Sequence, residues 1–343
     1  MTSLFDIEEI FPDDAAGSVR LPRRQAGSSP QGLAVTLLAD YTLNTRAWLP
    51  SAAIVALLAE SGVSHAGARA AISRLARRGV LEGSRQGRHS SYRLTEDAAA
   101  SLSVGGRWVI ASMTEVAAWD GQWTLVAFSL PQERNVERRA LRGQLRWLGY
   151  APLYDGLWVS PHGFTDKAKD HLAQLTLGAV TVFRARQVEL DAILGRDPLD
   201  AWDTEAIAGQ YESFVRRWNP LLPRIRSRDL RGAEAVRART EVMDTYRRFP
   251  LLDPQLPVSL LPAGWLREPA AEAFAAVYDG LSEAAQDHVR AVAADYTDNP
   301  SPGIAAHTVA DLLAGVRQTH APNTSRSGRQ QSQLNRRRPP IAR

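Results

Sequence analysis

The sequence predicts an α+β protein with three folded parts. Three helical patterns followed by two short alternating strands fill residues 30–100, and strands alternate with helices over residues 107–190. Residues 200–298 carry apolar residues at helical spacing almost throughout. These observations predict a winged helix-turn-helix at the N-terminus, a ferredoxin-like middle domain and a helical C-terminal domain.

The two ends of the chain show no such periodicity. Residues 1–29 mix acidic residues with proline and glycine, and residues 299–343 finish in a stretch rich in arginine. Segments that cannot bury an apolar face do not fold by themselves. We therefore expect a disordered leader at 1–29 and a disordered basic tail at 299–343, which would add sequence-independent affinity for phosphate.

Apolar residues at helical spacing predict the first two helices. The first contains Ala34, Leu37, Leu38 and Tyr41, and the second contains Ile54, Leu57 and Leu58. Pro50 and Ser51 precede the second helix, and we expect Ser51 to be its N-cap. The link that follows, residues 60–63, has the length and the glycine of the turn in a helix-turn-helix.

The third helix has the pattern of a DNA-recognition helix. Ser64 can cap its first turn, and Gly79 can end it. The apolar stripe that faces a core consists of Ala68, Ala71, Ile72 and Leu75. The opposite face combines small residues with arginines, which can pair with guanine edges or reach phosphates. This pattern predicts a helix that enters the major groove.

Two short strands after this helix, residues 80–83 and 90–94, predict a β-hairpin with a basic turn at residues 85–88. A hairpin in this place is the wing of a winged helix-turn-helix, and its basic tip would hold phosphate or the minor groove. The predicted DNA-binding residues of helix and wing are Ser64, His65, Arg69, Ser73, Arg74, Arg77, Arg85, Arg88 and His89.

Positive charge is concentrated in this part of the chain. The formal net charge is only +4, but residues 30–95 contain eight arginines and three acidic residues. The tail from residue 321 holds six more arginines and no acidic residue, so the remainder of the chain is net acidic. A basic patch on one domain is the electrostatic signature of a surface that binds nucleic acid. We therefore expect double-stranded DNA to be the partner.

A linker rich in alanine and serine, residues 98–106, leads to the middle domain. The clearest elements of that domain are strands at 123–128, 157–160 and 180–183 and helices at 136–148 and 167–175. With a further strand or loop before residue 157, the order predicts a ferredoxin-like βαββαβ sheet. Such a sheet leaves an exposed face or edge, which a partner subunit usually covers.

The last third is predicted to be helical. One helix face carries Ile207, Tyr211, Phe214, Val215 and Trp218. A second helix is expected at residues 229–249 and a third at residues 272–292. Between them, residues 250–265 form a loop pinned by several prolines.

Composition and motifs exclude several classes of function. The chain has no cysteine, which excludes disulfides, thiol nucleophiles and cysteine-ligated metals. No apolar run approaches a membrane span and the N-terminus is acidic, so we expect a cytoplasmic protein with no membrane partner. Serine-nucleophile motifs, phosphate-cradling glycine loops and histidine pairs at metal spacing are missing. We therefore expect neither an enzyme nor a protein that carries a metal or cofactor.

Several motifs, most of them anchored by tryptophan, run through these parts in order. They are Ala71-Ile72-Ser73-Arg74-Leu75, Trp119-Asp120-Gly121-Gln122-Trp123, Gly156-Leu157-Trp158-Val159-Ser160-Pro161 and Tyr246-Arg247-Arg248-Phe249-Pro250. With these motifs, residues 30–295 resemble the PaaX family of bacterial transcriptional regulators, named for the repressor of phenylacetate catabolism. The chain departs from the family at His65, Ala66 and Gly67, where charged residues are usual, and in its basic tail.

The resemblance implies a repressor that works as a homodimer and has a Cas2-like middle domain. It also implies release from DNA when phenylacetyl-coenzyme A or a similar aryl thioester binds. Two copies of the helix at residues 64–78 would then enter successive major grooves about 34 Å apart, on an inverted-repeat operator.

A thioester effector would need arginines for its phosphates and an apolar pocket for its acyl group. The candidate effector-binding residues are Arg247, Arg248 and Trp265, near the proline-pinned loop. Two alternatives stay open: a metal-dependent nuclease acting through the Cas2-like domain, and a DNA-binding regulator without a small-molecule effector. The nuclease would need a carboxylate near the end of its first strand, where this chain has none before Glu133.

Overall fold

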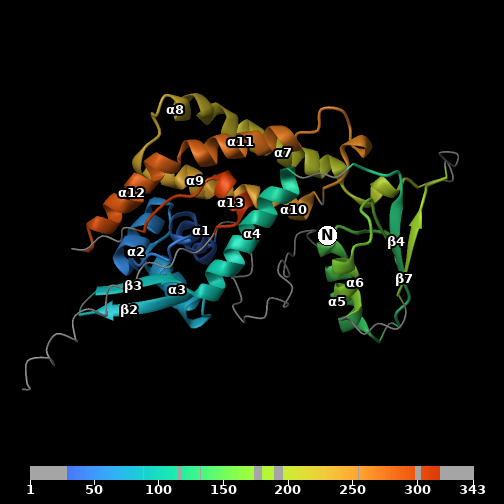
Figure 1. Cartoon of the computed structure of the whole chain (residues 1–343), viewed down its shortest axis with the longest axis horizontal. Helices are drawn as coiled ribbons and strands as arrows, with labels where there is room; N and C mark the ends of the chain where they lie inside the picture. Colours follow the sequence, from blue (N-terminus) through green and yellow to red (C-terminus); the bar gives the residue numbers. More distant parts are fainter. Residues whose placement is uncertain are drawn as a thin grey trace, which may run out of the picture.

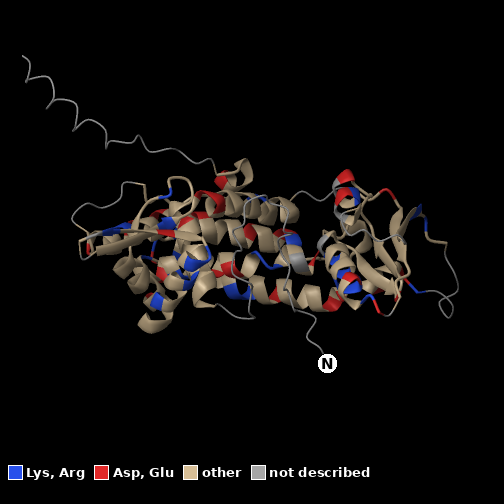
Figure 2. Cartoon of the chain, turned by 90° about the horizontal axis from the view of Figure 1, so that it is seen from below, with Lys and Arg blue, Asp and Glu red and all other residues tan. Residues whose placement is uncertain are grey.

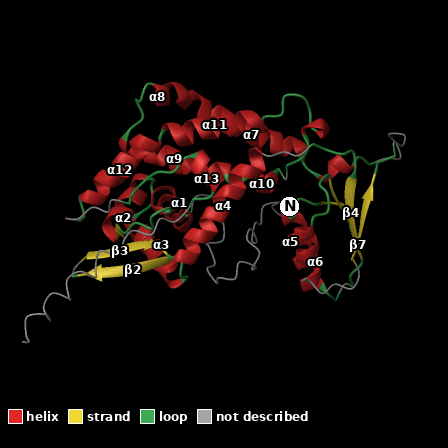
Figure 3. Cartoon of the chain, viewed as in Figure 1, coloured by secondary structure: helices red, strands yellow, loops and turns green. Residues whose placement is uncertain are grey.

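The computed structural model describes residues 29–87, 89–114, 118–131, 133–173, 180–188, 196–253, 255–297 and 303–316. These residues form an elongated molecule, with a larger and mainly helical body at one end and a small sheet with two helices at the other (Figure 1). Figure 3 distinguishes the helices, strands and loops. Within the described ranges, no helix combines the length with the apolar composition that crossing a bilayer requires.

Three helices open the N-terminal module, defined as residues 29–94: α1 (Pro30–Thr42), α2 (Ser51–Glu60) and α3 (His65–Arg77). Ser29 caps α1, because its hydroxyl accepts a hydrogen bond from the amide of Gly32 at 3.1 Å. The prediction that Ser51 caps α2 is wrong by one residue. Pro50 is held extended by β-pairing and takes the N-cap position, so Ser51 is the first helical residue.

The hairpin that follows α3 is longer than predicted. Its strands are β2 (Leu81–Gln86) and β3 (His89–Leu94), and β1 (Leu49–Pro50) pairs with the other edge of β3. Gly87 turns the chain with a φ of +59°, a left-handed value that suits glycine. Arg85 and His89 therefore lie in the paired strands rather than in the turn, while Arg88 lies outside the described residues.

The segment predicted as a linker, residues 98–106, is helical instead. It belongs to α4 (Glu96–Thr114), which also takes in residues 107–114, predicted to open the middle domain. Alanine is the best helix former, and the buried Ala98, Ala99 and Ile110 pack α4 against the rest of the helical body. The linker prediction is wrong because small residues give little apolar contrast between one helix face and the other.

The middle domain has the predicted βαββαβ order. Its elements are β4 (Trp123–Phe128), α5 (Asn135–Trp147), β5 (Ala151–Tyr154), β6 (Leu157–Ser160), α6 (Asp166–Ala173) and β7 (Val180–Ala185). The strand order is β5-β6-β4-β7 with every pair antiparallel, which is the order of a ferredoxin-like sheet. Val126, Leu141, Leu145 and Trp158 form the core between this sheet and its two helices.

The other face of this sheet meets the C-terminal part of the chain. Trp123 on β4 stacks on Trp202 with ring centroids 6.2 Å apart, and Leu153 and Val159 pack beside it. Phe183 on β7 is 52% exposed. Among the described residues, this face is thus covered at one end and exposed at Phe183 on its β7 edge.

The C-terminal part begins with the 3-10 turn η1 (Pro198–Ala201). Its helices are α7 (Thr204–Trp218), α8 (Leu222–Arg226), α9 (Gly232–Tyr246), α10 (Phe249–Leu252), α11 (Arg267–Gly280) and α12 (Ser282–Ala294). The helix predicted at 272–292 is therefore two helices. Leu281 is buried and serves as the end of α11 and the start of α12, and Gly280 before it packs too tightly against Ile225 to carry a Cβ without a shift.

The helix predicted at 229–249 is shorter than expected. It starts at Gly232, where φ is +59°, and ends before a separate short helix, α10. Pro250 lies in the first turn of α10, a position that needs no amide hydrogen, so it begins a helix rather than a loop.

Residues 303–316 overturn part of the prediction of a disordered tail at 299–343. They include α13 (Val309–Ala314), which has a capping box between Thr308 and Asp311. Ile304 and Leu312 are buried in the main core, and this packing stabilises a helix too short to form by itself. Residues 1–28 and 317–343 lie outside the described residues, so the expected leader and most of the tail stay predictions.

One continuous core joins the N-terminal module to the C-terminal helices. It contains Leu38, Tyr41 and Ile54 from α1 and α2 together with Val242 from α9 and Phe274 from α11. The core of the middle domain is separate from it. The helical body in Figure 1 is therefore built from both ends of the described sequence, with α4 running through it.

Candidate nucleic-acid interface

The orientation of α3 is fixed by its apolar face. Ala68, Ala71, Ile72 and Leu75 are at most 2% exposed and contact α1 and α2, as the 3.6-residue periodicity predicts. The opposite face consequently points to solvent.

This outer face of α3 carries the residues predicted to contact DNA. The exposed side chains are His65, Arg69, Ser73, Arg74 and Arg77. Arg69, Arg74 and Arg77 form no hydrogen bond or ion pair with any residue that the structure describes. Three guanidinium groups on one helix are thus available for a ligand, and small residues at Ala66 and Ala70 let its backbone come close to one.

Ser64 has a structural task at the start of α3. Its hydroxyl accepts from the amide of Gly67 at 3.1 Å, which caps the helix as predicted. A Cβ on Gly67 would lie 3.0 Å from that same hydroxyl. Gly67, one of the positions where the family usually has charged residues, therefore leaves room for the Ser64 cap.

The β2–β3 hairpin contacts α3 through β2. Arg85 and His89 are exposed near its tip, and the Nε of Arg85 donates to the carbonyl oxygen of Gly87 at 3.4 Å. The predicted contact Arg88 lies outside the described residues. Helix α3 is in contact with β2, so the hairpin lies beside the helix in the fold (Figure 1).

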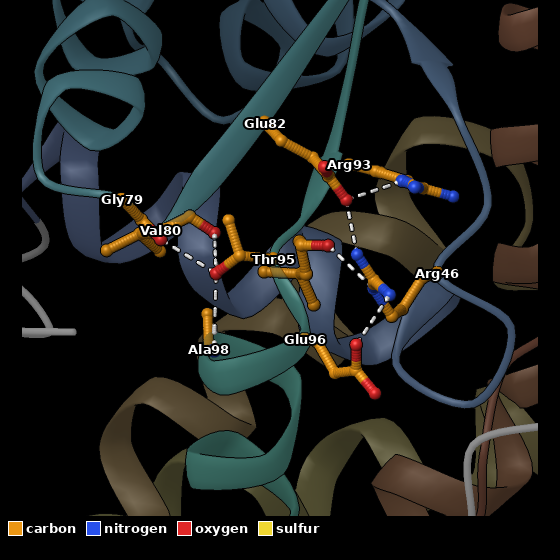
Figure 4. Close-up of polar contacts among 9 residues, drawn as sticks. Arg46, Gly79, Val80, Glu82, Arg93, Thr95, Glu96 and Ala98 are labelled. Atoms are coloured by element: carbon orange, nitrogen blue, oxygen red, sulfur yellow. Dashed lines mark hydrogen bonds and ion pairs between the residues drawn. The ribbon is translucent and has the colours of Figure 1, made fainter. Parts of the chain in front are cut away.

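Two arginines counted toward the positive charge of this region are neutralised at the base of the hairpin (Figure 4). Glu82 on β2 accepts hydrogen bonds from Arg46 and from the Nε of Arg93, the latter at 2.7 Å. Arg46 also donates to the carbonyl oxygen of Leu94 at 2.9 Å and lies 3.9 Å from Glu96. Arg46 therefore fixes the hairpin to the body, and Arg93 pairs with Glu82 across the two strands of the hairpin.

The sequence contains one signal for the ion pairs of Arg46, Glu82 and Arg93, because Glu82 is the one acidic residue in the hairpin. It does not reveal the partner, because Arg46 reaches Glu82 from the loop after α1, where its φ is +49°. Left-handed backbone in a residue other than glycine is uncommon and has to be stabilised by its surroundings. The two charge-assisted hydrogen bonds of Arg46 supply that stabilisation.

Thr95 ties the end of α3 to the start of α4 (Figure 4). Its hydroxyl donates to the carbonyl oxygen of Gly79 at 2.7 Å and accepts from the amide of Ala98 at 3.3 Å. The residue that caps α4 thus also holds the turn that closes the third helix. A shift of α3 would therefore also displace the first turn of α4.

The charge of α3 itself is positive. Figure 2 shows the molecule from below, with basic and acidic residues mixed over both of its ends. In α3 the basic residues are concentrated in the last turn, with Arg74 and Arg77. No acidic residue lies in this helix, so its field is uniformly positive.

Among the described residues, the three candidate effector residues bind two different carboxylates. Arg247 and Arg248 both hydrogen-bond to the carboxylate of Asp244, which is almost fully buried. Trp265 instead points its indole N–H at Asp253, 3.4 Å away. Both arginines are thus engaged within the protein.

Trp265 lines a shallow cavity of about 340 Å³ between the start of α7 and the loop before α11. Glu205 and Glu212 are the charged residues of its lining. Carboxylates repel the phosphates of a coenzyme A thioester, so this cavity has the wrong charge for them.

Asp253 is the centre of a buried cluster that the sequence did not reveal. Arg267 donates to it through Nε at 2.8 Å and through its terminal nitrogen at 2.7 Å, and Tyr211 donates its hydroxyl at 2.9 Å. Burial raises the pKa of Tyr211 far above its ordinary value, and the neighbouring carboxylate adds to this effect. This cluster fastens the loop before α11 to α7.

Within the described ranges, no three histidine, aspartate or glutamate side chains lie close enough together to hold a metal ion. Leu130, near the end of β4, is buried, and the first acidic residue beyond it is the exposed Glu133.

Three stretches of the chain match known protein families. Residues 29–98 match the PaaX-like protein family, residues 116–193 match the PaaX protein central Cas2-like domain, and residues 202–291 match the PaaX-like protein C-terminal domain. The chain is also 28% identical over 246 residues to the Transcriptional repressor PaaX of Escherichia coli (strain K12), which covers 69% of this chain and 75% of that protein.

A solved structure, the Uncharacterized protein Rv0674 from Mycobacterium tuberculosis, is 23% identical and aligns with 77% of this chain and 98% of its own, with a TM-score of 0.48. The three family matches follow one another along the chain and together span more than half of it. The resemblance seen in the sequence motifs is thereby confirmed: the chain belongs to the PaaX family.

Proposed function

We propose that this protein is a DNA-binding transcriptional regulator of the repressor type, and that its N-terminal module is a winged helix-turn-helix. The observation that carries the proposal is the outer face of α3, where Arg69, Arg74 and Arg77 are exposed and free of partners among the described residues. The relative in Escherichia coli, whose name states that it is a transcriptional repressor, supports it.

Each part of the surface has its own task in this proposal. Arg69, Ser73, Arg74 and Arg77 read base edges or fix the register of α3 in the major groove. Arg85, Arg88 and His89 on the hairpin hold phosphate or the adjacent minor groove.

The protein would bind as a homodimer. Two α3 helices then enter successive major grooves, with half-sites about 34 Å apart or a multiple of it, and the operator is an inverted repeat. The open β7 edge of the middle sheet, with its exposed Phe183, is a surface that a second subunit can cover.

An aryl-coenzyme A thioester would release the protein from DNA. The family resemblance is what supports this part of the proposal. The cavity beside Trp265 does not support it, because its carboxylates have the wrong charge for such a ligand. The alternative is a regulator without a small-molecule effector, and the experiment described next distinguishes the two.

The test is a binding titration on the DNA upstream of the protein's own gene, at two salt concentrations, with and without phenylacetyl-coenzyme A and other aryl thioesters. We expect sequence-specific binding that weakens with salt and that one thioester abolishes. Specific binding that ignores every thioester would overturn the effector part alone. Binding with no preference for any sequence would overturn the proposed function.

A further inference from the structure

Residues 303–316, called the strap, lie beyond the last range that matches the PaaX family. They return from the end of the helical body to its middle, where α13 runs beside α4 (Figure 1). The strap contacts three parts of the fold that are far apart in the sequence.

The first contact is with the N-terminal module. The amide of Ala305 donates to the carbonyl oxygen of Tyr41 at the end of α1, at 2.9 Å. The hydroxyl of Thr45 donates to the carbonyl oxygen of Gly303 at 2.6 Å. These bonds attach the strap to the segment that leads from α1 to the Arg46 contacts at the base of the hairpin.

The second contact is with α4. Leu312 on α13 packs against Gly106 so closely that a Cβ on that glycine would lie 2.9 Å from the leucine side chain. The hydroxyl of Ser103 donates to the carbonyl oxygen of Val316 at 3.1 Å. The strap thereby holds the helix that Thr95 connects to α3.

The third contact is with the C-terminal helices. The amide of Val309 donates to Asp279 at 2.9 Å, and the amide of Ala306 donates to the side chain of Gln286 at 3.0 Å. Arg290 on α12 donates to the carbonyl oxygen of Ile304 at 2.8 Å. Polar groups of the strap backbone are therefore satisfied by both halves of the helical body.

A buried polar network lies where these contacts meet. Tyr278 on α11 donates its hydroxyl to Asp40 on α1 at 2.7 Å, and Nε2 of His307 on the strap lies 3.1 Å from the same hydroxyl. While Asp40 is ionised it accepts the tyrosine proton, and Nε2 of His307 then donates to the tyrosine oxygen. All three side chains are at most 5% exposed.

Arg239 on α9 completes this network. Its guanidinium is fully buried, donates to the carbonyl oxygens of Tyr278 and His307, and lies 3.6 Å from the centre of the Tyr278 ring. If the strap left, Arg239 would lose an acceptor and Tyr278 would lose a partner. Arg239 would keep the carbonyl oxygen and the ring of Tyr278. Removing one hydrogen-bond acceptor from a buried charge is still costly, so intermediate positions of the strap are unfavourable.

From this geometry we infer that the strap is an intramolecular lock that fixes the orientation of α3 relative to the C-terminal helices. The C-terminal part meets the middle sheet through Trp202 on Trp123. In a dimer that pairs through the β7 edge of that sheet, the orientation of α3 therefore contributes to the distance between the two recognition helices. The lock would thus make the protein selective for one spacing of the two half-sites. This last step rests on the proposed function, whereas the lock itself does not.

The test compares full-length variants at two neighbouring positions of α13. Leu312→Asp places a charge in the core and should release the strap, whereas Ala310→Asp places the same charge on its exposed face and is the matched control. Each is titrated with operators whose half-sites are moved apart by one or two base pairs. We expect wild type and Ala310→Asp to lose at least tenfold in affinity on the altered operators, and Leu312→Asp to lose less than threefold.

Hydrogen exchange tests the lock without DNA. Release of the strap should increase exchange of the α1 and α4 amides by at least tenfold in Leu312→Asp and leave it unchanged in Ala310→Asp. His307→Ala is the milder second variant if Leu312→Asp does not fold. Unchanged hydrogen exchange in Leu312→Asp would overturn the lock. Unchanged selectivity of Leu312→Asp for half-site spacing would overturn the effect of the lock on operator choice. A wild-type protein that prefers no DNA sequence would overturn the proposed function instead.

Discussion

The arginines of the N-terminal module fall into two groups, those paired with an acidic residue and those left exposed. Arg46 and Arg93 are bound by Glu82, while Arg69, Arg74 and Arg77 are free of partners among the described residues. The sequence predicts the second group on the outer face of α3 correctly, because helical periodicity decides which side of a helix is buried. It does not reveal the Arg46–Glu82 pair, which joins residues 36 positions apart, although Arg93 lies opposite Glu82 within the hairpin.

Replacing Glu82 with glutamine should change DNA binding and stability in opposite directions. Two guanidinium groups lose their counter-charge, so the free energy of unfolding should fall by about 1 kcal/mol, a small loss because the pairs are partly exposed. Affinity for nonspecific DNA should rise, with a steeper dependence on salt. The slope of log affinity against log salt measures this, and an unchanged slope would show that Arg46 and Arg93 stay unavailable to DNA.

Two residues of the buried network should give opposite pH dependences of stability. Burial, helped by Arg239, lowers the pKa of His307 from 6.5 to about 3, so the unfolded chain binds the extra proton and stability falls as pH drops below 6.5. Burial raises the pKa of Asp40 from 3.8 to about 6, so the folded chain binds the extra proton and stability rises as pH drops from 6 to 4.

The two effects largely cancel in the wild type between pH 6 and pH 4. Asp40→Asn should therefore lose stability on acidification relative to wild type, and His307→Gln should gain it, each by about 1.4 kcal/mol per pH unit. Urea unfolding at pH 6, 5 and 4 measures both slopes. Parallel curves for wild type and the two variants would show that neither residue is held in its unusual state.

At the scale of elements, the sequence predicts those with strong apolar contrast and misses those without it. The strands of the middle domain and helices α3 and α7 lie within a few residues of their predicted positions. The predictions of a linker at the alanine- and serine-rich start of α4 and of a disordered tail at α13 are both wrong. Both helices owe their stability to packing between distant segments, such as Leu312 on Gly106, which local patterns do not encode.

Two helical glycines should respond differently to alanine. At Gly209 in α7 an added Cβ would meet nothing within 4 Å, so Gly209→Ala should raise the free energy of unfolding by about 0.5–1 kcal/mol through helix propensity. At Gly106 in α4 the new Cβ would press on Leu312, so Gly106→Ala should gain nothing or lose stability. Equal stabilisation by both substitutions would contradict the close packing of α13 on α4.

The molecule has two bodies, each with its own hydrophobic core, whereas the sequence is divided into three consecutive parts. The N-terminal module and the C-terminal helices share one core although the middle domain separates them in the chain. Predicting this arrangement from sequence would have required the contacts of α1 with α9 and α12 with α2, which no local pattern indicates. The sequence thus predicts the three parts. It does not predict that the first and the third form one body and the middle domain a second.

This division should be visible when one core is weakened. Leu38→Ala on α1 should lower stability by about 2–5 kcal/mol and raise hydrogen exchange in both the N-terminal module and α9 and α11. Leu145→Ala on α5 is the matched variant and should raise exchange in the middle sheet alone. Exchange confined to the N-terminal module in Leu38→Ala would contradict the shared core.

The central claim is that the outer face of α3 reads DNA sequence, and its most direct test is the specificity of Arg77→Ala. The free energy that separates operator binding from nonspecific binding should fall by about 1–3 kcal/mol, because a base contact is lost. This is a loss of roughly five- to 150-fold in the ratio of the two affinities. Arg85→Ala should instead weaken all DNA alike, and the exposed Arg216→Ala on α7 should change nothing. An Arg77→Ala protein that keeps the full ratio of the wild type would contradict this placement of the recognition surface.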